Sequence, residues 1–104
     1  MIIYQYSDQQ HSFNFPFQLA PKHLSTDHAE DAICVSIEVQ VGDIIVAGSD
    51  GLFDNIHAYK MNNDVKAAVE NDTLLTTLPE KLANEAIEHG KNPQYESPFA
   101  QRAK

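Results

Sequence analysis

Two aspartates, Asp50 and Asp54, are the residues of this sequence whose type and spacing could do chemistry. They flank Gly51 and follow the apolar run Ile44–Ala47. A short apolar run bounded by turn residues indicates a strand covered on both faces. A glycine just beyond such a strand lets the backbone turn sharply and lets a ligand approach the main chain. The pattern therefore predicts that Asp50 is held at the end of a buried strand, where its carboxylate could bind a metal ion.

Other interpretations of this motif are also possible. A calcium loop fits poorly, because an EF-hand needs an oxygen ligand at the position that Leu52 occupies. A nucleophile elbow fits poorly too, since Gly48–Gly51 lacks the spacing of glycine and serine that this turn requires. A plainer alternative is that Asp50 starts a turn and Asp54 caps a short helix. The residues alone leave open whether the motif is a turn or a metal-binding carboxylate.

The other reactive side chains predict no second site. The five histidines lack the H-x-x-x-H spacing of zinc ligands, and one cysteine cannot form a C-x-x-C pair. Cys34 has no base or cation beside it in the sequence, so we interpret it as an inert strand residue. The rings of Phe13–Phe17 could line a pocket, but anchoring of a loop is the favoured interpretation.

Composition limits the class of function. The chain has 104 residues and a formal net charge of -8. We therefore expect one small domain or a piece of a larger one, and no nucleic-acid partner, because phosphate backbones are bound by clustered Lys and Arg. The single cysteine excludes an internal disulfide and favours a reducing compartment. No apolar run approaches the roughly 20 residues of a membrane-spanning helix, so no membrane span is expected.

A hairpin is the local structure that the sequence favours most before the motif. Apolar and polar residues alternate over 33–40, as in a half-buried strand. A turn at 41–43 would fold the run 44–47 back as the second arm. Nearer the N-terminus, residues 1–6 suit a strand because they are β-branched and aromatic. Residues 7–24 show neither the periodicity of a helix nor the alternation of a strand, and are expected to form an ordered loop that aromatic rings hold in place.

Helical patterns follow the motif. The predicted segments are a short stretch near 56–59, a helix over about 63–71, a helix from Thr77 that Gly90 ends, and a last one over 99–103. Asn62 or Asn63 would cap the helix over about 63–71. Thr77 and Glu80 match a capping box with Pro79 in the first turn. The apolar face of that helix comprises Leu78, Leu82, Ala83, Ala86 and Ile87.

The segment Gly42–Asn55 resembles a signature of the metal-dependent type 2C protein phosphatases, the PPM family. It contains Gly-Asp, a hydrophobic strand, Asp-Gly, two hydrophobic residues and a further Asp. Two more segments, Gln9–Leu19 and Asn92–Gln101, resemble the mitochondrial-type branch related to T-cell activation protein phosphatase. The resemblance runs from about Tyr4 to the last residue.

This resemblance implies a fold and an activity. The family fold is α+β, a four-layer α-β-β-α sandwich of two antiparallel sheets flanked by helices, and residues 1–104 would be a C-terminal part of it, incomplete at both ends. The activity is hydrolysis of phosphoserine and phosphothreonine in proteins by a water that two magnesium or manganese ions activate. By the resemblance, Asp50 is a metal ligand, Gly51 supplies turn geometry and Asp54 caps the helix that follows. The branch implies a mitochondrial location, and otherwise an intracellular one.

Departures from the family pattern limit what the chain could do alone. The family has a first, N-terminal Asp-Gly motif whose carboxylate bridges both metal ions, and this motif has no counterpart in the chain. The family's last metal-binding Asp, which comes just before a final strand, has no counterpart either. One carboxylate holds magnesium weakly, so we expect weak or no metal binding and no activity from this chain by itself. Open sheet edges would need a missing N-terminal half or another subunit to cover them. The alternatives are a degenerate, non-catalytic phosphatase-like module that serves as a binding or structural subunit, and a metal-binding domain of unrelated fold.

Overall fold

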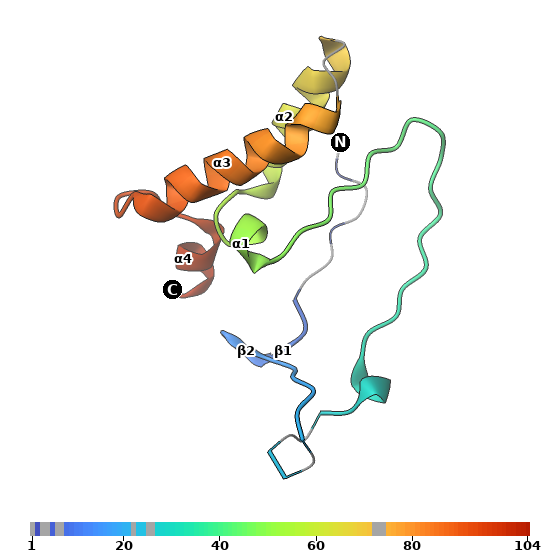
Figure 1. The fold of residues 1–104 in the computed structure, drawn as a ribbon, viewed down its shortest axis with the longest axis vertical. Helices are drawn as coiled ribbons and strands as arrows, with labels where there is room; N and C mark the ends of the chain where they lie inside the picture. Colours follow the sequence, from blue (N-terminus) through green and yellow to red (C-terminus); the bar gives the residue numbers. More distant parts are fainter. Residues whose placement is uncertain (1, 3–4, 6–7, 22, 25–26, 72–74) are drawn as a thin grey trace. The chain divides into compact units, whose positions relative to one another are not determined.

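A computed structural model describes residues 2, 5, 8–21, 23–24, 27–71 and 75–104 of the chain (Figure 1). The elements are β1 (Gln10–Ser12), β2 (Phe15–Pro16), the 3-10 helix η1 (Ala29–Asp31), α1 (Asp50–Phe53), α2 (Ala58–Glu70), the 3-10 helix η2 (Leu75–Thr77), α3 (Leu78–Lys91) and α4 (Pro98–Arg102). They form two compact units, one over residues 3–43 and one built on residues 44–104. The predicted α+β class is confirmed, and the four-layer sandwich remains a prediction.

The unit over residues 3–43 contains a small antiparallel hairpin formed by β1 and β2. Its register pairs Ser12 with Phe15. Asn14 closes the turn with a φ of 58°, a left-handed conformation that Asn tolerates better than most residues. The Asn14 amide donates to Gln10 Oε1 at 3.0 Å. The prediction of a loop without strands over residues 7–24 is therefore wrong at this hairpin.

Aromatic rings and a carboxylate both contribute contacts within this unit. The His11 ring stacks on Phe17 at 3.9 Å between centroids and lies 5.8 Å from the ring of Phe15, although Phe15 is 58% exposed. Asp27 adds further contacts, because it accepts hydrogen bonds from the Gln18 amide and His11, both at 2.8 Å. The Gln18 amide, and then His11, lower the pKa of Asp27 against the opposing effect of burial.

The predicted hairpin over residues 33–47 is wrong except at its turn. The Asp43 amide donates to the Gln40 carbonyl at 3.0 Å, and the Gln40 amide donates to Asp43 Oδ2 at 2.8 Å. Gly42 has a φ of +96°, which favours glycine. Residues 33–40 and 43–49 contain neither helix nor strand. The strand predicted over residues 1–6 lies outside the described residues except at positions 2 and 5.

The apolar side chains of this segment are exposed. The alternating set Ile33, Val35, Ile37 and Val39 is 46–58% exposed, and Ile45, which was predicted to be buried, is 77% exposed. A strand is stable only when its backbone pairs with a neighbour and its apolar face is covered. Residues 33–49 have neither in the described structure, so the alternating pattern produces an extended chain and no sheet.

The core of the second unit lies between α2 and α3, with α1 against α3 (Figure 1). Ile56 is 1% exposed and Leu82 is 4% exposed, and the other buried apolar residues are Met61, Ala68, Leu78 and Ala86. Leu52 and Phe53 of α1 pack on this cluster. Of the helices in the described residues, none is both long and apolar enough to cross a membrane.

Helices are present where the sequence predicted them after the motif, but several of their ends differ, and α1 was not predicted. The N-cap of α2 is His57, so the predicted short stretch and the longer helix are one element, and Asn62 and Asn63 lie inside it. The C-cap of α3 is Asn92, one residue beyond Lys91, so Gly90 does not end this helix. The helix predicted over 99–103 is confirmed as α4, because Ser97 Oγ accepts from the Ala100 amide at 3.1 Å.

The start and the apolar face of α3 also differ from prediction. Thr77 has φ -89° and ψ -16°, which are helical values, whereas a capping box needs an extended residue at this position. Ala83 and Ile87 are exposed, and only Leu78, Leu82 and Ala86 of the predicted face are buried. The buried face of α3 is therefore narrower than the apolar stripe in its sequence.

Candidate functional site

Asp50 is the first residue of α1 and is exposed to solvent. Ser49, the residue before it, has an extended backbone with φ -85° and ψ -178°. The chain therefore changes from extended to helical at the position where the sequence predicted a polar end to an apolar run. The strand itself does not form, so the predicted position of Asp50 at the end of a strand is wrong, while the exposure of its carboxylate at a bend is observed.

Gly48 carries the steric requirement that the sequence assigned to Gly51. A Cβ on Gly48 would lie 2.8 Å from Leu52 Cδ2, closer than carbon atoms approach one another, so this glycine lets Leu52 pack back over the bend. Gly51 lies within α1, and the nearest atom to a Cβ there is Ser49 Oγ at 3.4 Å. The turn that Gly51 was expected to supply is thus made by the residues before it.

Asp54 joins α1 to α4. Its carboxylate forms an ion pair with Arg102, and its carbonyl accepts a hydrogen bond from the Phe99 amide at 3.2 Å. The prediction that Asp54 caps the helix that follows is wrong, because His57 occupies that position. Since Arg102 already binds the Asp54 carboxylate, Asp54 does not present a second free carboxylate beside Asp50.

His89 of α3 holds the end of the same bend. Its Nδ1 lies 2.7 Å from the Asn55 carbonyl oxygen, so the hydrogen is assigned to Nδ1, and its ring stacks on Tyr95 at 3.8 Å between centroids. The Asn55 side-chain amide in turn donates to the Gly51 carbonyl at 2.9 Å. No local spacing of the histidines could have identified this partner of His89, which lies 34 positions away in the sequence.

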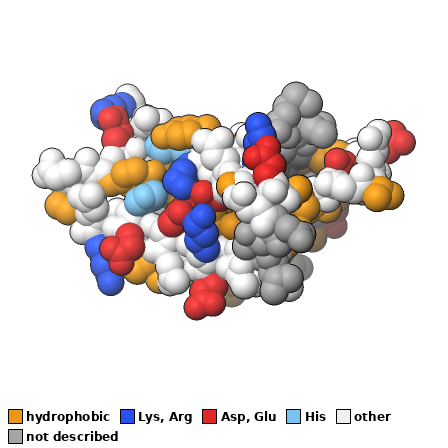
Figure 2. Space-filling view, turned by 90° about the horizontal axis from the view of Figure 1, so that it is seen from above, with side chains coloured by type: hydrophobic (Ala, Val, Ile, Leu, Met, Phe, Trp, Pro, Cys, Tyr) orange, Lys and Arg blue, Asp and Glu red, His pale blue; other side chains and the backbone are white. Residues whose placement is uncertain are grey.

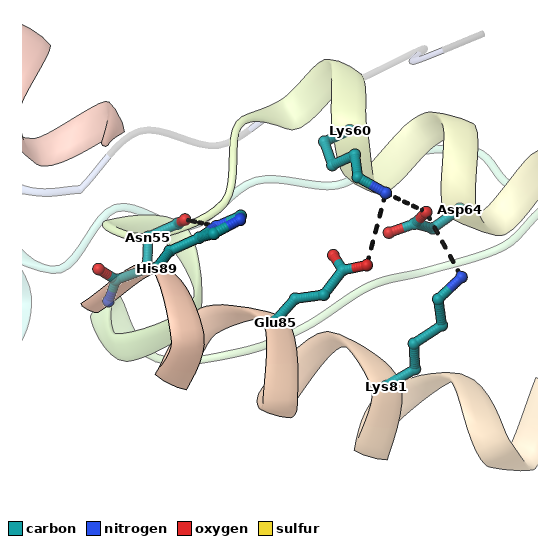
Figure 3. Close-up of polar contacts among 6 residues, drawn as sticks. All are labelled: Asn55, Lys60, Asp64, Lys81, Glu85 and His89. Carbon is teal, nitrogen blue, oxygen red and sulfur yellow. Dashed lines mark hydrogen bonds and ion pairs between the residues drawn. The ribbon is translucent and has the colours of Figure 1, made fainter. Parts of the chain in front are cut away.

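A cluster of four charged side chains joins α2 to α3, and no part of the sequence analysis predicted it (Figure 3). Lys60 Nζ lies 2.7 Å from Asp64 Oδ1 and 3.4 Å from Glu85 Oε1. Lys81 Nζ lies 3.6 Å from the same Asp64 oxygen. In the space-filling view, acidic and basic side chains lie next to one another on the face that is seen (Figure 2).

Burial and charge act in opposite directions on this cluster. Burial raises the pKa of Asp64, but the hydrogen bond from Lys60 and the charges of Lys60 and Lys81 outweigh this effect and lower the pKa from its ordinary value. The hydrogen bond to Asp64 raises the pKa of Lys60. Burial, followed by the charges of Tyr59 and Glu85, raises the pKa of Tyr95.

These residues do not by themselves fit a two-metal centre. Among the described residues, no three or more His, Cys, Asp or Glu side chains gather to hold a metal ion. A hollow of about 560 Å³ runs along α3 and is lined in part by Glu85, Glu88 and His89, but Asp50 does not line it. The structure therefore offers one exposed carboxylate at the predicted metal position.

Comparison with curated proteins relates almost the whole chain to phosphatases. The chain is 37% identical over 109 aligned positions to protein phosphatase PTC7 homolog of Homo sapiens, and the match covers 98% of this chain and 36% of that protein. It is 33% identical to probable protein phosphatase 2C 26 of Arabidopsis thaliana, a match that covers 99% of this chain and 33% of that protein. It is 36% identical to the PTC7 homolog of Xenopus laevis, a match that covers 98% of this chain and 37% of that protein.

The chain spans about a third of the length of these relatives. No family model matches the sequence. No solved structure matches it either. The chain is therefore related to known proteins through its sequence similarity to these phosphatases.

Proposed function

This chain belongs to the protein phosphatase 2C family, and we propose that it forms a C-terminal part of the catalytic domain of a protein serine/threonine phosphatase. The observation that carries the proposal is the relationship of 98% of the chain to a phosphatase, which includes the Asp-Gly motif at Asp50. The solvent-exposed position of Asp50 at the start of α1 supports it, because a ligand or metal ion can reach this carboxylate. The substrates would be phosphoserine and phosphothreonine proteins.

Asp50 would supply one oxygen ligand to a divalent metal ion, magnesium or manganese. Such an ion, where bound, lowers the pKa of a coordinated water and neutralises charge on phosphoryl oxygens. The described residues offer no further carboxylate at this bend, because Asp54 is paired with Arg102. The other ligands would therefore come from residues beyond these, and this chain alone would bind metal weakly and would not turn over substrate.

The exposed apolar segment supports the same proposal. Residues 33–40 alternate in the way that a half-buried strand does, yet their apolar side chains are exposed. In a four-layer α-β-β-α sandwich this segment and the run 44–47 would pair as strands, and a second sheet would cover them. Either the rest of a phosphatase domain or another subunit would provide that cover.

Phosphate release from a phosphothreonine peptide in the presence of manganese tests the proposal. We expect no turnover from the wild-type chain alone. Turnover that Asp50→Ala abolishes and the exposed acidic control Glu38→Ala leaves intact would show that these residues hold a complete centre, and would overturn the proposed incompleteness. Calorimetry with manganese is the companion measurement, and tight binding at a defined stoichiometry would support a metal-binding domain of another kind.

A second candidate is a degenerate module without catalysis, which acts as a binding or structural subunit. The single free carboxylate at the bend favours it. The flanking coding sequence separates the two candidates. An upstream Asp-Gly motif and a downstream Asp before a final strand, in the same reading frame, favour the phosphatase, and their absence favours the module. A mitochondrial location would follow from the family branch, and imaging of the tagged protein tests it.

A further inference from the structure

The buried carboxylate of Asp64 has one oxygen that no cation satisfies. Asp64 is 5% exposed, and the ammonium groups of Lys60 and Lys81 both approach its Oδ1, at 2.7 and 3.6 Å. Its other oxygen, Oδ2, is buried without a hydrogen-bond partner, as is Oε2 of Glu85. A buried charged oxygen without a donor has lost its hydration and gained no hydrogen bond in return, so a donor at this position would be stabilising.

Glu85 is the group that Asp64 Oδ2 faces. Figure 3 shows the unbonded oxygen of Asp64 pointing across from α2 toward the Glu85 carboxyl group of α3. Lys60 contacts both carboxylates, which holds them on the same side of the helix contact. Two carboxylates accept hydrogen bonds and cannot donate to each other while both are ionised. One proton between them would convert this contact from repulsion to a hydrogen bond.

We propose that Asp64 and Glu85 form a proton-binding pair, in which a proton taken up from solvent lies between the two carboxyl groups and links α2 to α3. The proton resides on one carboxyl group, which donates it in a hydrogen bond to the other. No covalent bond other than this O–H forms or breaks. The pair is distinct from the Asp50 bend and does not depend on the proposed phosphatase function.

Other ionisable groups lie near the pair. Lys60 of α2 contacts both carboxylates, and Lys81 of α3 contacts Asp64. Tyr95 lies close enough to sense the charges of Tyr59, Glu85 and Lys60, and Glu80, Glu88 and His89 of α3 line the same hollow as Glu85. Lys60 and Lys81 oppose proton uptake because they stabilise the ionised carboxylates. Because both ammonium groups approach Asp64, its carboxylate is the acceptor of the pair, and the Glu85 carboxyl group is the one that would carry the proton and donate it.

Carboxyl-carbon NMR of the full chain tests the proposal directly. The side-chain carboxyl signals of Asp64 and Glu85 are followed from about pH 8 to about pH 3, a range that spans ordinary carboxyl titration. Groups that share a proton titrate with two inflections each, because each carbon senses both protonation steps. We expect such coupled curves in the wild-type chain and a single inflection for Glu85 in Asp64→Asn. Independent, single-step curves for both carboxyl groups in the wild type would overturn the proposal.

Thermal unfolding of variants gives a second, independent measurement. Glu85→Gln imitates the protonated acid, because its amide can donate to Asp64 Oδ2 at any pH. At neutral pH we expect Glu85→Gln to melt about 4–8 °C above Glu85→Ala, and the matched change Glu88→Gln to leave the melting temperature within about 2 °C of the wild type. Equal melting temperatures for the Gln and Ala variants would contradict the hydrogen bond. The wild-type titration decides the question even if a variant does not fold.

Discussion

The α2–α3 pair and the segment 33–47 both have regular apolar patterns, but only the helices are folded. In α2 and α3 the apolar residues meet across the helix contact, and Leu82 is 4% exposed. In the extended segment, Val35 is 52% exposed although it alternates as a strand residue does. A helix satisfies its backbone within the segment, whereas a strand needs another strand. A regular apolar pattern in this chain therefore predicts folded structure only where the surface that it packs against is also among the described residues.

The largest effect is expected at the centre of the helical core. Leu82→Ala removes a buried side chain from the contact of α3 with α2, and the free energy of unfolding should fall by about 2–5 kcal/mol. Urea unfolding followed by circular dichroism measures it. Ile87→Ala is the matched control on the same helix, because Ile87 is 52% exposed, and it should change the free energy by about 0.5 kcal/mol or less. Equal costs at the two positions would show that α3 is not packed as described.

Acid should weaken the helical unit through Asp64. Folding lowers the pKa of the Asp64 carboxyl group from its ordinary value of 3.8. The stability that its ionised form contributes is therefore complete above pH 3.8 and is lost as the pH falls through the lower pKa of the folded chain. We expect about 1 kcal/mol of stability to disappear below about pH 4, and Asp64→Asn to remove this part of the pH dependence. Urea unfolding at several pH values measures it. An unchanged acid profile in Asp64→Asn would contradict the ion pairs with Lys60 and Lys81.

Local signals predicted the helices, and long-range contacts determined the rest. The apolar spacing of Leu78, Leu82 and Ala86 was sufficient for α3, because a helix pattern lies within one segment. The caps were less predictable, since the N-cap of α2 is His57 and not an asparagine. Strand pairing was not predictable from alternation alone, because alternation does not specify a partner.

The candidate site shows the same division. Sequence located the exposed carboxylate of Asp50, which depends on its immediate neighbours. It assigned the wrong role to Asp54, because the partner, Arg102, lies 48 positions away. It also missed the contact of Lys60 with Glu85, which are 25 positions apart on two helices. Charged residues at helical spacing are usually solvated, so no local signal distinguished these from an exposed face.

A smaller effect is expected at the turn that begins the extended segment's second arm. Gly42 has a φ of +96°, and no atom lies within 4 Å of a Cβ placed there, so Gly42→Ala meets backbone strain and no clash. We expect the population of the turn to fall about fivefold, equivalent to about 1 kcal/mol. Hydrogen exchange of the Asp43 amide, which donates to the Gln40 carbonyl, reports this change. Melting of the helical unit should not change, and a large loss there would show that the turn supports the core.

The smallest effect on stability is expected in the extended segment, residues 33–47. Ile37→Ser changes a side chain that is 46% exposed, so in this chain the free energy of unfolding should change by about 0.5 kcal/mol or less, measured by urea unfolding. A cost of about 2 kcal/mol or more would contradict the exposed segment and show that it packs as a strand. If a longer polypeptide or a partner supplies the second sheet, the same substitution should become costly there. The difference between the two measurements would then report how much of this segment's structure comes from its neighbours.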